Sequence, residues 1–277
     1  MKDVGDKIFL VTGGAMGMGK LVAERFAADG ATVVLWDLDE ARLAETAEEF
    51  KKKGWPVHTY VIDVTDRLKV YETAERVRNE VGVVDVLMNN AGVIMAGPFL
   101  EVDDEWHRKT MDVNVNAYMW MMKAFMPDMV ARNEGHIINI ASAAGVIYVP
   151  LQASYCASKS AVINLTDSVR AEMQKFKKKG VRLTIICPFF VKTGMFEGAK
   201  KLPLTTRLLE PEFMADKIYM AYHKNRNYLS EPLMVKIVPL LRALSVTRVV
   251  NDWCWNHIFR GYGVMDEWTG RQGRRRQ

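Results

Sequence analysis

Short apolar runs alternate with longer stretches of helical periodicity up to about residue 190 of the chain. The short runs are rich in Val, Ile and Leu and predict buried strands, whereas apolar positions in the longer stretches recur with the period of a helix. The predicted strands cover residues 7–11, 31–36, 57–62, 83–88 and 137–140, and the predicted helices include residues 20–27, 40–53, 105–129 and 155–176. This alternation predicts an α/β fold with a doubly wound parallel sheet, in which ligands bind at the carboxyl ends of the strands.

Composition is compatible with one domain. At 277 residues and 49% hydrophobic content the chain can bury a sizeable core, and we expect a single domain over residues 1–270. Four units of the net charge of +5 come from arginines in the last seven residues, at positions 271, 274, 275 and 276. We expect this basic tail, residues 271–277, to be disordered. The positive net charge therefore gives little support for nucleic-acid binding.

A glycine-rich run joins the first predicted strand to the first predicted helix. Its sequence is Thr12-Gly13-Gly14-Ala15-Met16-Gly17-Met18-Gly19. Strand, glycine turn and helix form the context of a dinucleotide site, where Gly13 allows the tight turn, Gly17 lets the backbone approach the pyrophosphate and Gly19 allows close packing. We place Met16 and Met18 in the same predicted site. A glycine loop that only turns the chain is the alternative.

Asp37 ends the second predicted strand, eighteen residues after Gly19. A carboxylate at this position is placed to accept hydrogen bonds from the adenosine ribose, and its charge would repel the 2′-phosphate of NADP. Neither Met16 nor Leu38 offers a cation for that phosphate. The sequence therefore predicts NAD rather than NADP, with Asp39 as the N-cap of the next helix.

Two further strand ends complete the predicted adenosine side. Asp63 and Val64 follow the third strand, where the carboxylate would accept a hydrogen bond from the adenine amino group; a cap on the following helix is the alternative. Asn90, Ala91 and Gly92 follow the fourth strand. Small and amide side chains at this position let the backbone approach the cofactor and tie strand ends together.

Tyr155 and Lys159 stand four residues apart, and Ser142 lies thirteen residues before the tyrosine. Residues at this spacing share one face of a helix, so we expect the lysine ammonium beside the tyrosine hydroxyl. A neighbouring cation lowers the pKa of a tyrosine from about 10 and makes it a proton acceptor nearer neutral pH. A Tyr-x-x-x-Lys pair also occurs on solvated helices, but here it follows a nucleotide-binding pattern.

These motifs in this order resemble the short-chain dehydrogenase/reductase family, from about residue 7 to residue 193. The resemblance implies a Rossmann-type fold and a catalytic tetrad completed by Asn114, which would hold the active-site helix open and help organise a proton-relay water. Ser142 would bind the substrate oxygen, and Tyr155 would exchange the hydroxyl proton. Lys159 would hold the nicotinamide ribose and lower the tyrosine pKa. A helix kink at Asn114 and a cap at Ser142 are the structural alternatives.

The residues after the tetrad indicate which branch of the family the chain resembles. Pro188, Val191 and Thr193 belong to the predicted cofactor site, and family members use such a threonine to meet the nicotinamide carboxamide. Phe189 stands where the family has glycine, so the backbone there must adopt a conformation open to a residue with a side chain. This bulky residue, the following Thr-Gly-Met-Phe and a late Met-Asp-x-x-x-Gly at residues 265–270 are similar to the branch of retinol dehydrogenases and 17β-hydroxysteroid dehydrogenases.

The resemblance implies an NAD-dependent oxidoreductase that acts on an apolar alcohol or the matching carbonyl compound, such as a steroid, a retinoid or a long-chain alcohol. The alternatives are an NAD(P)H-dependent reductase of 3-oxoacyl or other polar carbonyl substrates and a cofactor-sensing binding protein without turnover. No metal is expected, because the histidines at 58, 107, 136, 223 and 257 lack ligand spacing and the cysteines at 156, 187 and 254 form no Cys-x-x-Cys pair.

We expect residues 194–260 to determine which substrate binds, because the residues before them form the cofactor and catalytic sites that the family shares. Residues 196–213 suit a lid over an apolar ligand. The apolar segment 233–259 suits buried core or a subunit contact, with a pocket wall or peripheral membrane contact as alternatives. No signal sequence or transmembrane span is evident, so we expect a cytoplasmic protein. Family resemblance implies a homodimer or homotetramer formed through the helices at 105–129 and 155–176.

Overall fold

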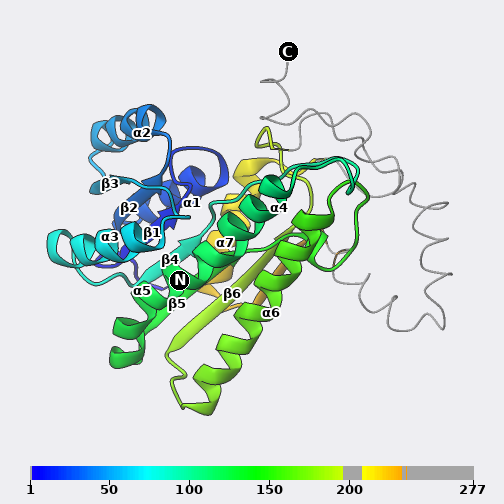
Figure 1. Ribbon diagram of the computed structural model, residues 1–277. Coiled ribbons are helices and arrows are strands. Elements are labelled where there is room, and N and C mark those ends of the chain that lie inside the picture. Colours follow the sequence, from blue (N-terminus) through cyan, green and yellow to red (C-terminus); the bar gives the residue numbers. More distant parts are fainter. Residues whose placement is uncertain (1, 196–207, 233–234, 236–277) are drawn as a thin grey trace.

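In the computed structural model, seven parallel strands form one sheet in the order β3-β2-β1-β4-β5-β6-β7 (Figure 1). The structure describes residues 2–195, 208–232 and 235. The strands are β1 (Ile8–Thr12), β2 (Thr32–Asp37), β3 (Val57–Val61), β4 (Val86–Asn89), β5 (Gly135–Ile140), β6 (Val181–Pro188) and β7 (Tyr228–Glu231). The predicted doubly wound parallel sheet is confirmed. The strand order reverses between β1 and β4, which is where such sheets open a crevice for ligands.

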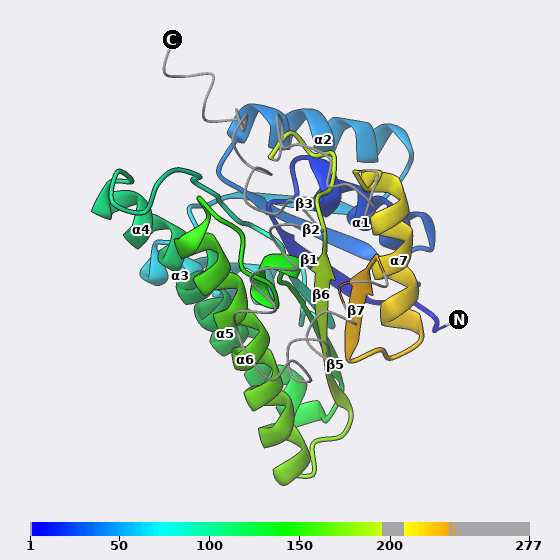
Figure 2. The ribbon, with the colours of Figure 1, turned by 90° about the vertical axis from the view of Figure 1, so that its right-hand side faces the viewer.

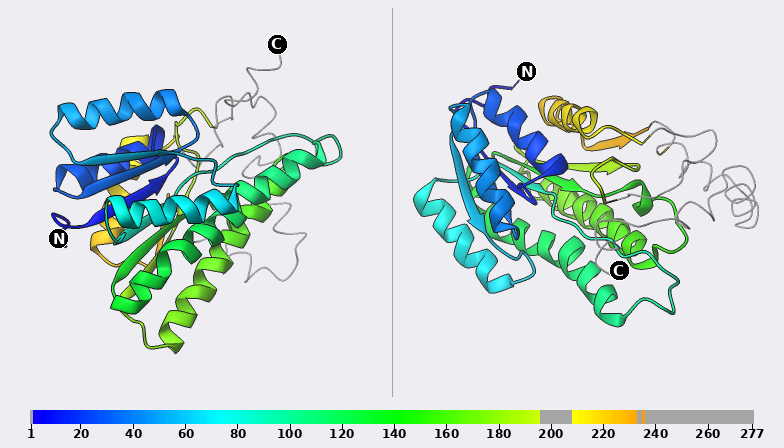
Figure 3. Two further views of the ribbon diagram at one scale, coloured as in Figure 1. Left: turned by 60° about the vertical axis from the view of Figure 1, so that its left-hand side comes forward. Right: turned by 90° about the horizontal axis from the view of Figure 1, so that it is seen from above.

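Helices cover both faces of the sheet. The helices are α1 (Gly17–Ala28), α2 (Glu40–Lys52), α3 (Arg67–Glu80), α4 (Asp104–Met111), α5 (Ala117–Arg132), α6 (Ala153–Lys175) and α7 (Pro211–His223). Views from several sides place α1, α2 and α7 on one side of the sheet and α3, α5 and α6 on the other (Figures 2 and 3). The strands inside the sheet are consequently buried on both faces, which explains their continuous apolar runs, whereas the edge strand β3 has three exposed residues.

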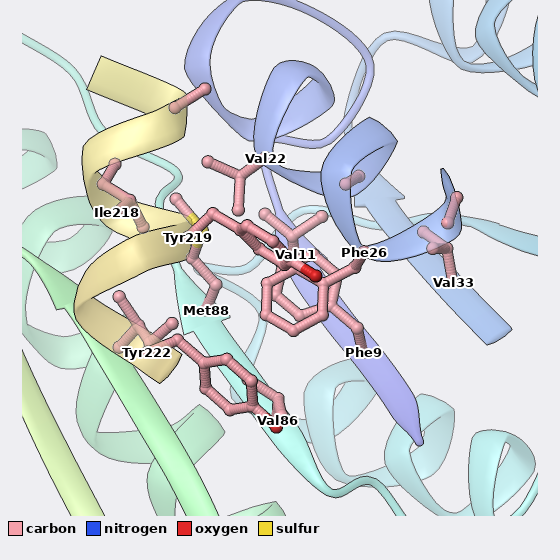
Figure 4. Close-up of a cluster of buried hydrophobic side chains, with 14 of the residues drawn as sticks. Phe9, Val11, Val22, Phe26, Val33, Val86, Met88, Ile218, Tyr219 and Tyr222 are labelled. Atoms are coloured by element: carbon pink, nitrogen blue, oxygen red, sulfur yellow. The ribbon is translucent and has the colours of Figure 1, made fainter. Parts of the chain in front are cut away.

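An aromatic cluster joins the sheet to α1 and α7. The rings of Phe9 on β1 and Phe26 on α1 stack with their centroids 4.0 Å apart, and Tyr219 and Tyr222 of α7 lie against Phe26 at 5.0 Å (Figure 4). Aromatic side chains bury a large apolar area. This packing fixes α1, and with it the glycine loop that precedes α1, against the sheet.

Most predicted elements agree with the structure to within a few residues, and the differences have local causes. The fourth strand begins at Val86 rather than residue 83, because the Asp85 carboxylate accepts the Ile8 N–H at 2.9 Å before the ladder starts. Asp39 caps α2 as predicted, since its side chain accepts a hydrogen bond from the Arg42 amide. The helix predicted over residues 105–129 is interrupted, because a π-helical segment (Asp112–Asn116) separates α4 from α5.

Within the described ranges, no helix combines the length and the apolar character that crossing a membrane requires. The predicted lid at 196–213 lies mostly outside these ranges, as do almost all of the apolar segment at 233–259 and the whole basic tail.

Candidate active site

One cleft at the carboxyl ends of the strands collects nearly all of the predicted site residues. Its volume is about 670 Å³, which suits a nucleotide cofactor together with part of a substrate. The predicted residues that line it are Gly13, Met16, Gly17, Met18, Asp37, Leu38, Asp63, Val64, Asn90, Ala91, Gly92, Ser142, Tyr155, Lys159, Pro188, Val191 and Thr193. Gly19 and Asn114 are buried beside the cleft rather than in its wall.

The glycine loop has the backbone that the sequence predicted. Gly13 and Gly17 have φ angles of +65° and +57°, a region that residues with a Cβ atom rarely adopt. A Cβ on Gly19 would lie 2.3 Å from the Gly13 carbonyl oxygen, so only glycine fits. The α1 helix begins at Gly17, and its N-cap, Met16, makes no side-chain cap hydrogen bond within the described residues. The first turn therefore presents backbone amides and positive partial charge to the cleft.

Asn90 holds two strand ends together. Its side-chain amide donates to the carbonyl oxygens of Thr12 at 3.0 Å and Gly13 at 3.1 Å. The Thr12 hydroxyl in turn accepts the backbone N–H groups of Asn90 and Ala91, both at 3.0 Å. The glycine loop is thereby fixed to the end of β4, the arrangement expected from the amide-rich strand end.

The two carboxylates of the predicted adenosine side are held by local amides. Asp37 accepts the N–H of Ala15 at 3.0 Å through one oxygen and that of Asp39 at 3.1 Å through the other. Asp63 accepts both the backbone N–H and the hydroxyl of Thr65, at 2.9 and 2.7 Å. Asp63 therefore closes a local turn and does not cap the next helix, whose N-cap is Asp66.

Ser142, Tyr155 and Lys159 come together from two elements. Ser142 follows β5 and caps a short 3₁₀ helix (Ala143–Gly145), with its hydroxyl accepting the Ala144 amide at 3.1 Å. Tyr155 lies in the first turn of α6 and hydrogen-bonds the Ser142 side chain. Lys159 lies one turn further along the helix, and its ammonium donates to the Ile140 carbonyl oxygen at 2.9 Å.

The pKa of Tyr155 differs from the sequence prediction. Burial raises it above its usual value, and the hydrogen bond from Ser142 opposes this only in part. Burial also lowers the pKa of Lys159 to about 7, so the ammonium is easily lost. The Lys159 nitrogen lies 5.7 Å from the centroid of the Tyr155 ring. The predicted lowering of the tyrosine pKa by this lysine is thus wrong for the chain by itself, because desolvation of the phenolate is the largest influence on that pKa and the buried Lys159 readily loses its charge.

Asn114 lies in the π-helical segment, a place where helices commonly kink. Its side chain also bridges: the carbonyl oxygen accepts the Val93 N–H at 2.9 Å, and the amide donates to the Val93 carbonyl oxygen at 2.9 Å and the Ser158 hydroxyl at 3.0 Å. Asn114 therefore links the loop after β4 to α6 next to Lys159.

The segment after β6 accommodates Phe189 without strain. Phe189 is absent from the residues with positive φ, and its N–H donates to the Glu231 carbonyl oxygen at 2.8 Å, beside the end of β7. Its ring contacts Phe190, with the centroids 4.5 Å apart, and it lines the cleft. The prediction that Phe189 has a backbone conformation open to a residue with a side chain is confirmed.

Residues on α4 and in the π-helical segment also line the cleft and were missed by the sequence analysis. They are Glu105, Trp106, Arg108, Lys109, Asp112 and Val113. Their spacing places several of them on one helix face, and this pattern could have indicated that they line a common site. Because most of them are charged, the pattern resembled an ordinary solvated face.

Comparison with known proteins agrees with this geometry. The sequence matches the short chain dehydrogenase family over residues 7–202. It is 40% identical over 245 residues to epidermal retinol dehydrogenase 2 of Mus musculus, covering 88% of this chain and 79% of that protein. It is 39% identical over 247 residues to estradiol 17-beta-dehydrogenase 11 of Pongo abelii, covering 89% and 82%. The predicted similarity to retinol and 17β-hydroxysteroid dehydrogenases is confirmed.

A solved structure shares the architecture. The short chain dehydrogenase/reductase of Burkholderia phymatum in complex with NAD has a TM-score of 0.79 and 28% sequence identity, covering 88% of this chain and 95% of that chain. With the family matched over most of the sequence and the fold shared, this chain belongs to the short-chain dehydrogenase family and acts on CH–OH groups with NAD or NADP.

Proposed function

We propose that this protein is an NAD-dependent oxidoreductase that transfers hydride between the nicotinamide and an apolar alcohol or its carbonyl product, with a steroid, a retinoid or a long-chain alcohol as substrate. Tyr155 is the proton acceptor and donor. The observation that carries the proposal is a single cleft that joins the glycine loop and Asp37 to Ser142, Tyr155 and Lys159.

The chain's own residues fit a dinucleotide. A Cβ on Gly17 would meet only Thr193, in an ordinary contact at 3.7 Å, and without that atom a pyrophosphate can approach the backbone amides of α1 more closely. Asp37, fixed by two amides, presents its carboxylate to the ribose hydroxyls. A bound nicotinamide supplies the hydride acceptor or donor, and Thr193 and Val191 line the cleft where it would lie.

The proton is handled by three side chains. Ser142 donates a hydrogen bond to the substrate oxygen, and Tyr155, which is hydrogen-bonded to Ser142, takes the hydroxyl proton during oxidation or returns it during reduction. The phenol is the form that burial favours, and it is the form that reduction of a carbonyl requires. Lys159 holds the ribose from the buried side of the cleft, where the Ile140 carbonyl oxygen fixes its ammonium.

Apolar groups close to Ser142 support an apolar substrate. Phe189 and Met195 line the cleft and pack against the buried cluster that contains Tyr155. Phe190 and Ile147 belong to the same cluster. The relatives named retinol dehydrogenase and estradiol dehydrogenase support the same substrate class. Burial of such a ligand is favoured by about 25 cal/mol for each Å² removed from water.

The test is a panel of apolar alcohols with NAD, with NADH absorbance as the measurement, followed by the Tyr155→Phe variant on the best substrate. We expect Tyr155→Phe to lower kcat by about a thousandfold or more while the NAD Kd is retained, because only the proton carrier is removed. Tyr71→Phe is the matched control, since Tyr71 packs against the core on α3 away from the cleft.

Three outcomes would contradict the proposal. Wild-type turnover in Tyr155→Phe would remove the tyrosine from its role. Faster reduction of 3-oxoacyl or other polar carbonyl substrates would favour the alternative reductase. Cofactor binding without turnover of any substrate would favour a cofactor-sensing protein.

A further inference from the structure

A second cavity opens at the amino ends of the strands, on the opposite edge of the sheet from the candidate active site. Its volume is about 360 Å³, and its wall comes from the segments that precede β1, β4 and β5, from the start of β6 and from the end of α7. This size accommodates a small ligand. The charged residues that line it are Lys2, Asp3, Lys7, Asp85, Glu134 and Arg182. The proposed reaction uses none of them.

The three carboxylates of this cavity are already engaged. Asp85 forms an ion pair with Arg132 at 3.1 Å, and Glu134 forms one with Lys7 at 2.7 Å. These two pairs balance each other's charge. Asp3 accepts a backbone N–H from two residues further along the chain at 3.0 Å, which holds it in its own turn.

Two cations of the cavity, Lys2 and Arg182, form no ion pair within the described residues. The neighbours of the Lys2 ammonium are neutral groups: His136 Nδ1 lies 3.4 Å away, and the centroid of the Tyr222 ring lies 4.1 Å away. Burial and the charge of Arg182 lower the pKa of Lys2 to about 8. Because the two like charges repel each other, an anion bound between them would be favoured.

The same two side chains have hydrogen-bond donors to give. An ammonium carries three N–H groups, of which the His136 contact uses one, and a guanidinium carries five. Arg182 is exposed and makes no hydrogen bond through its side chain within the described residues, so it is able to close on a ligand from outside. A phosphate group matches this donor set, because it carries close to two negative charges at pH 7 and offers several oxygens to a guanidinium fork.

We propose that this cavity binds a phosphate group between the Lys2 ammonium and the Arg182 guanidinium, either as inorganic phosphate or as the end of a small phosphate ester. The site is separate from the cofactor cleft and does not depend on the proposed function.

Calorimetric titration of the full chain with inorganic phosphate, and separately with glycerol 3-phosphate, measures the Kd for each source of the group. We expect Lys2→Met and Arg182→Ala each to weaken binding by about tenfold or more, the effect of losing a charge-assisted hydrogen bond. Arg182→Lys keeps the charge without the fork and should lose only part of the affinity. The tighter of the two probes identifies the source, and tight binding of either supports the site.

Matched controls remove the same charges elsewhere. Lys52→Met, at the exposed end of α2, and Arg67→Ala, at the exposed start of α3, should keep the wild-type Kd.

The backbone amides of the glycine loop offer phosphate a second place to bind, so the location needs its own measurement. We expect the NMR signals of the His136 ring to shift as phosphate is added, because His136 lines the cavity beside Lys2, while those of the exposed His58 stay fixed. His136 signals that stay fixed while phosphate saturates the protein would overturn the proposal. So would an unchanged Kd in both Lys2→Met and Arg182→Ala, or no binding of either probe.

Discussion

At the residue scale, His136 shows how burial sets protonation in this chain. The Thr184 hydroxyl donates to the Arg226 carbonyl oxygen, so its oxygen accepts a hydrogen bond from His136 Nε2–H at 2.7 Å. This leaves Nδ1 as the acceptor that faces the Lys2 ammonium, 3.4 Å away. Desolvation, reinforced by the charges of Lys2 and Arg182, lowers the pKa of His136 to about 3. The imidazole is a neutral packing group.

We expect His136 to make the free energy of unfolding depend on pH. Between pH 6.5 and about 3 the unfolded chain binds a proton that the folded chain excludes, so the free energy of unfolding falls as pH falls, by roughly 1.4 kcal/mol for each pH unit. The stabilisation is fully present above pH 6.5. Urea unfolding of His136→Gln between pH 4 and 7 should show a smaller slope than the wild type.

The control for that comparison is His58→Gln, because His58 is exposed on β3. This variant should keep the wild-type slope. Equal slopes in the wild type and His136→Gln would show that His136 does not exclude the proton in the folded state.

At the scale of elements, the π-helical segment between α4 and α5 connects three parts of the site. Asn114 satisfies both backbone groups of Val93 and reaches Ser158 on α6. Gly92, on the same loop, leaves room for Asn114 and Lys159, whose polar atoms would lie 3.3 and 3.7 Å from a Cβ there. The loop after β4, the π-helical segment and the start of α6 therefore hold one another in place.

Removing that connection should be costly. We expect Asn114→Ala to lower the free energy of unfolding by about 2–4 kcal/mol, because the part-buried N–H and C=O of Val93 and the buried Ser158 hydroxyl lose their partner. Hydrogen exchange at the Val93 amide should become faster. Asn116→Ala is the matched control: its half-buried amide donates to Asp112 within the same segment at 2.8 Å, and it should cost no more than about 1 kcal/mol.

A result in which both variants lose equal stability, or in which the Val93 amide stays protected in Asn114→Ala, would contradict this account. Activity lost together with stability would agree with a positioning role for Asn114.

At the scale of the molecule, the cleft draws on strands from both halves of the sheet. Glycine-loop residues follow β1, Asp37 ends β2, and Ser142 follows β5. A ligand that contacts all of them binds only the folded chain and therefore stabilises it.

We expect NAD at 100 times its Kd to add about 2.7 kcal/mol to the free energy of unfolding and to raise Tm by roughly 5 °C. Thermal unfolding measures this shift. ADP-ribose should reproduce most of it, because the glycine loop, Asp37 and Asn90 all belong to the adenosine and pyrophosphate side. Gly19→Ala, whose Cβ would meet the Gly13 carbonyl oxygen, should lose the shift, whereas Gly5→Ala should keep it, since its Cβ would make only an ordinary contact with Asp3. An unchanged Tm in the wild type would count against the cofactor site.

Subunit assembly, cytoplasmic location and peripheral membrane contact stay predictions from the sequence. Size-exclusion chromatography with light scattering addresses the first of them directly.

The sequence by itself determined the sheet, the order of the motifs and the cleft that gathers them. These depend on local signals: apolar runs for strands, glycines where φ is positive, and a fixed spacing between Tyr155 and Lys159. Parallel strands then bring their carboxyl ends to one edge whatever the loops contain, so residues at strand ends meet without further information.

Only the tertiary structure decided the protonation of Tyr155 and Lys159 and the π-helical segment at Asn114. Each depends on burial or on partners far away in the sequence. Desolvation acts through everything packed around a group, and the four-residue spacing of Tyr155 and Lys159 does not report it.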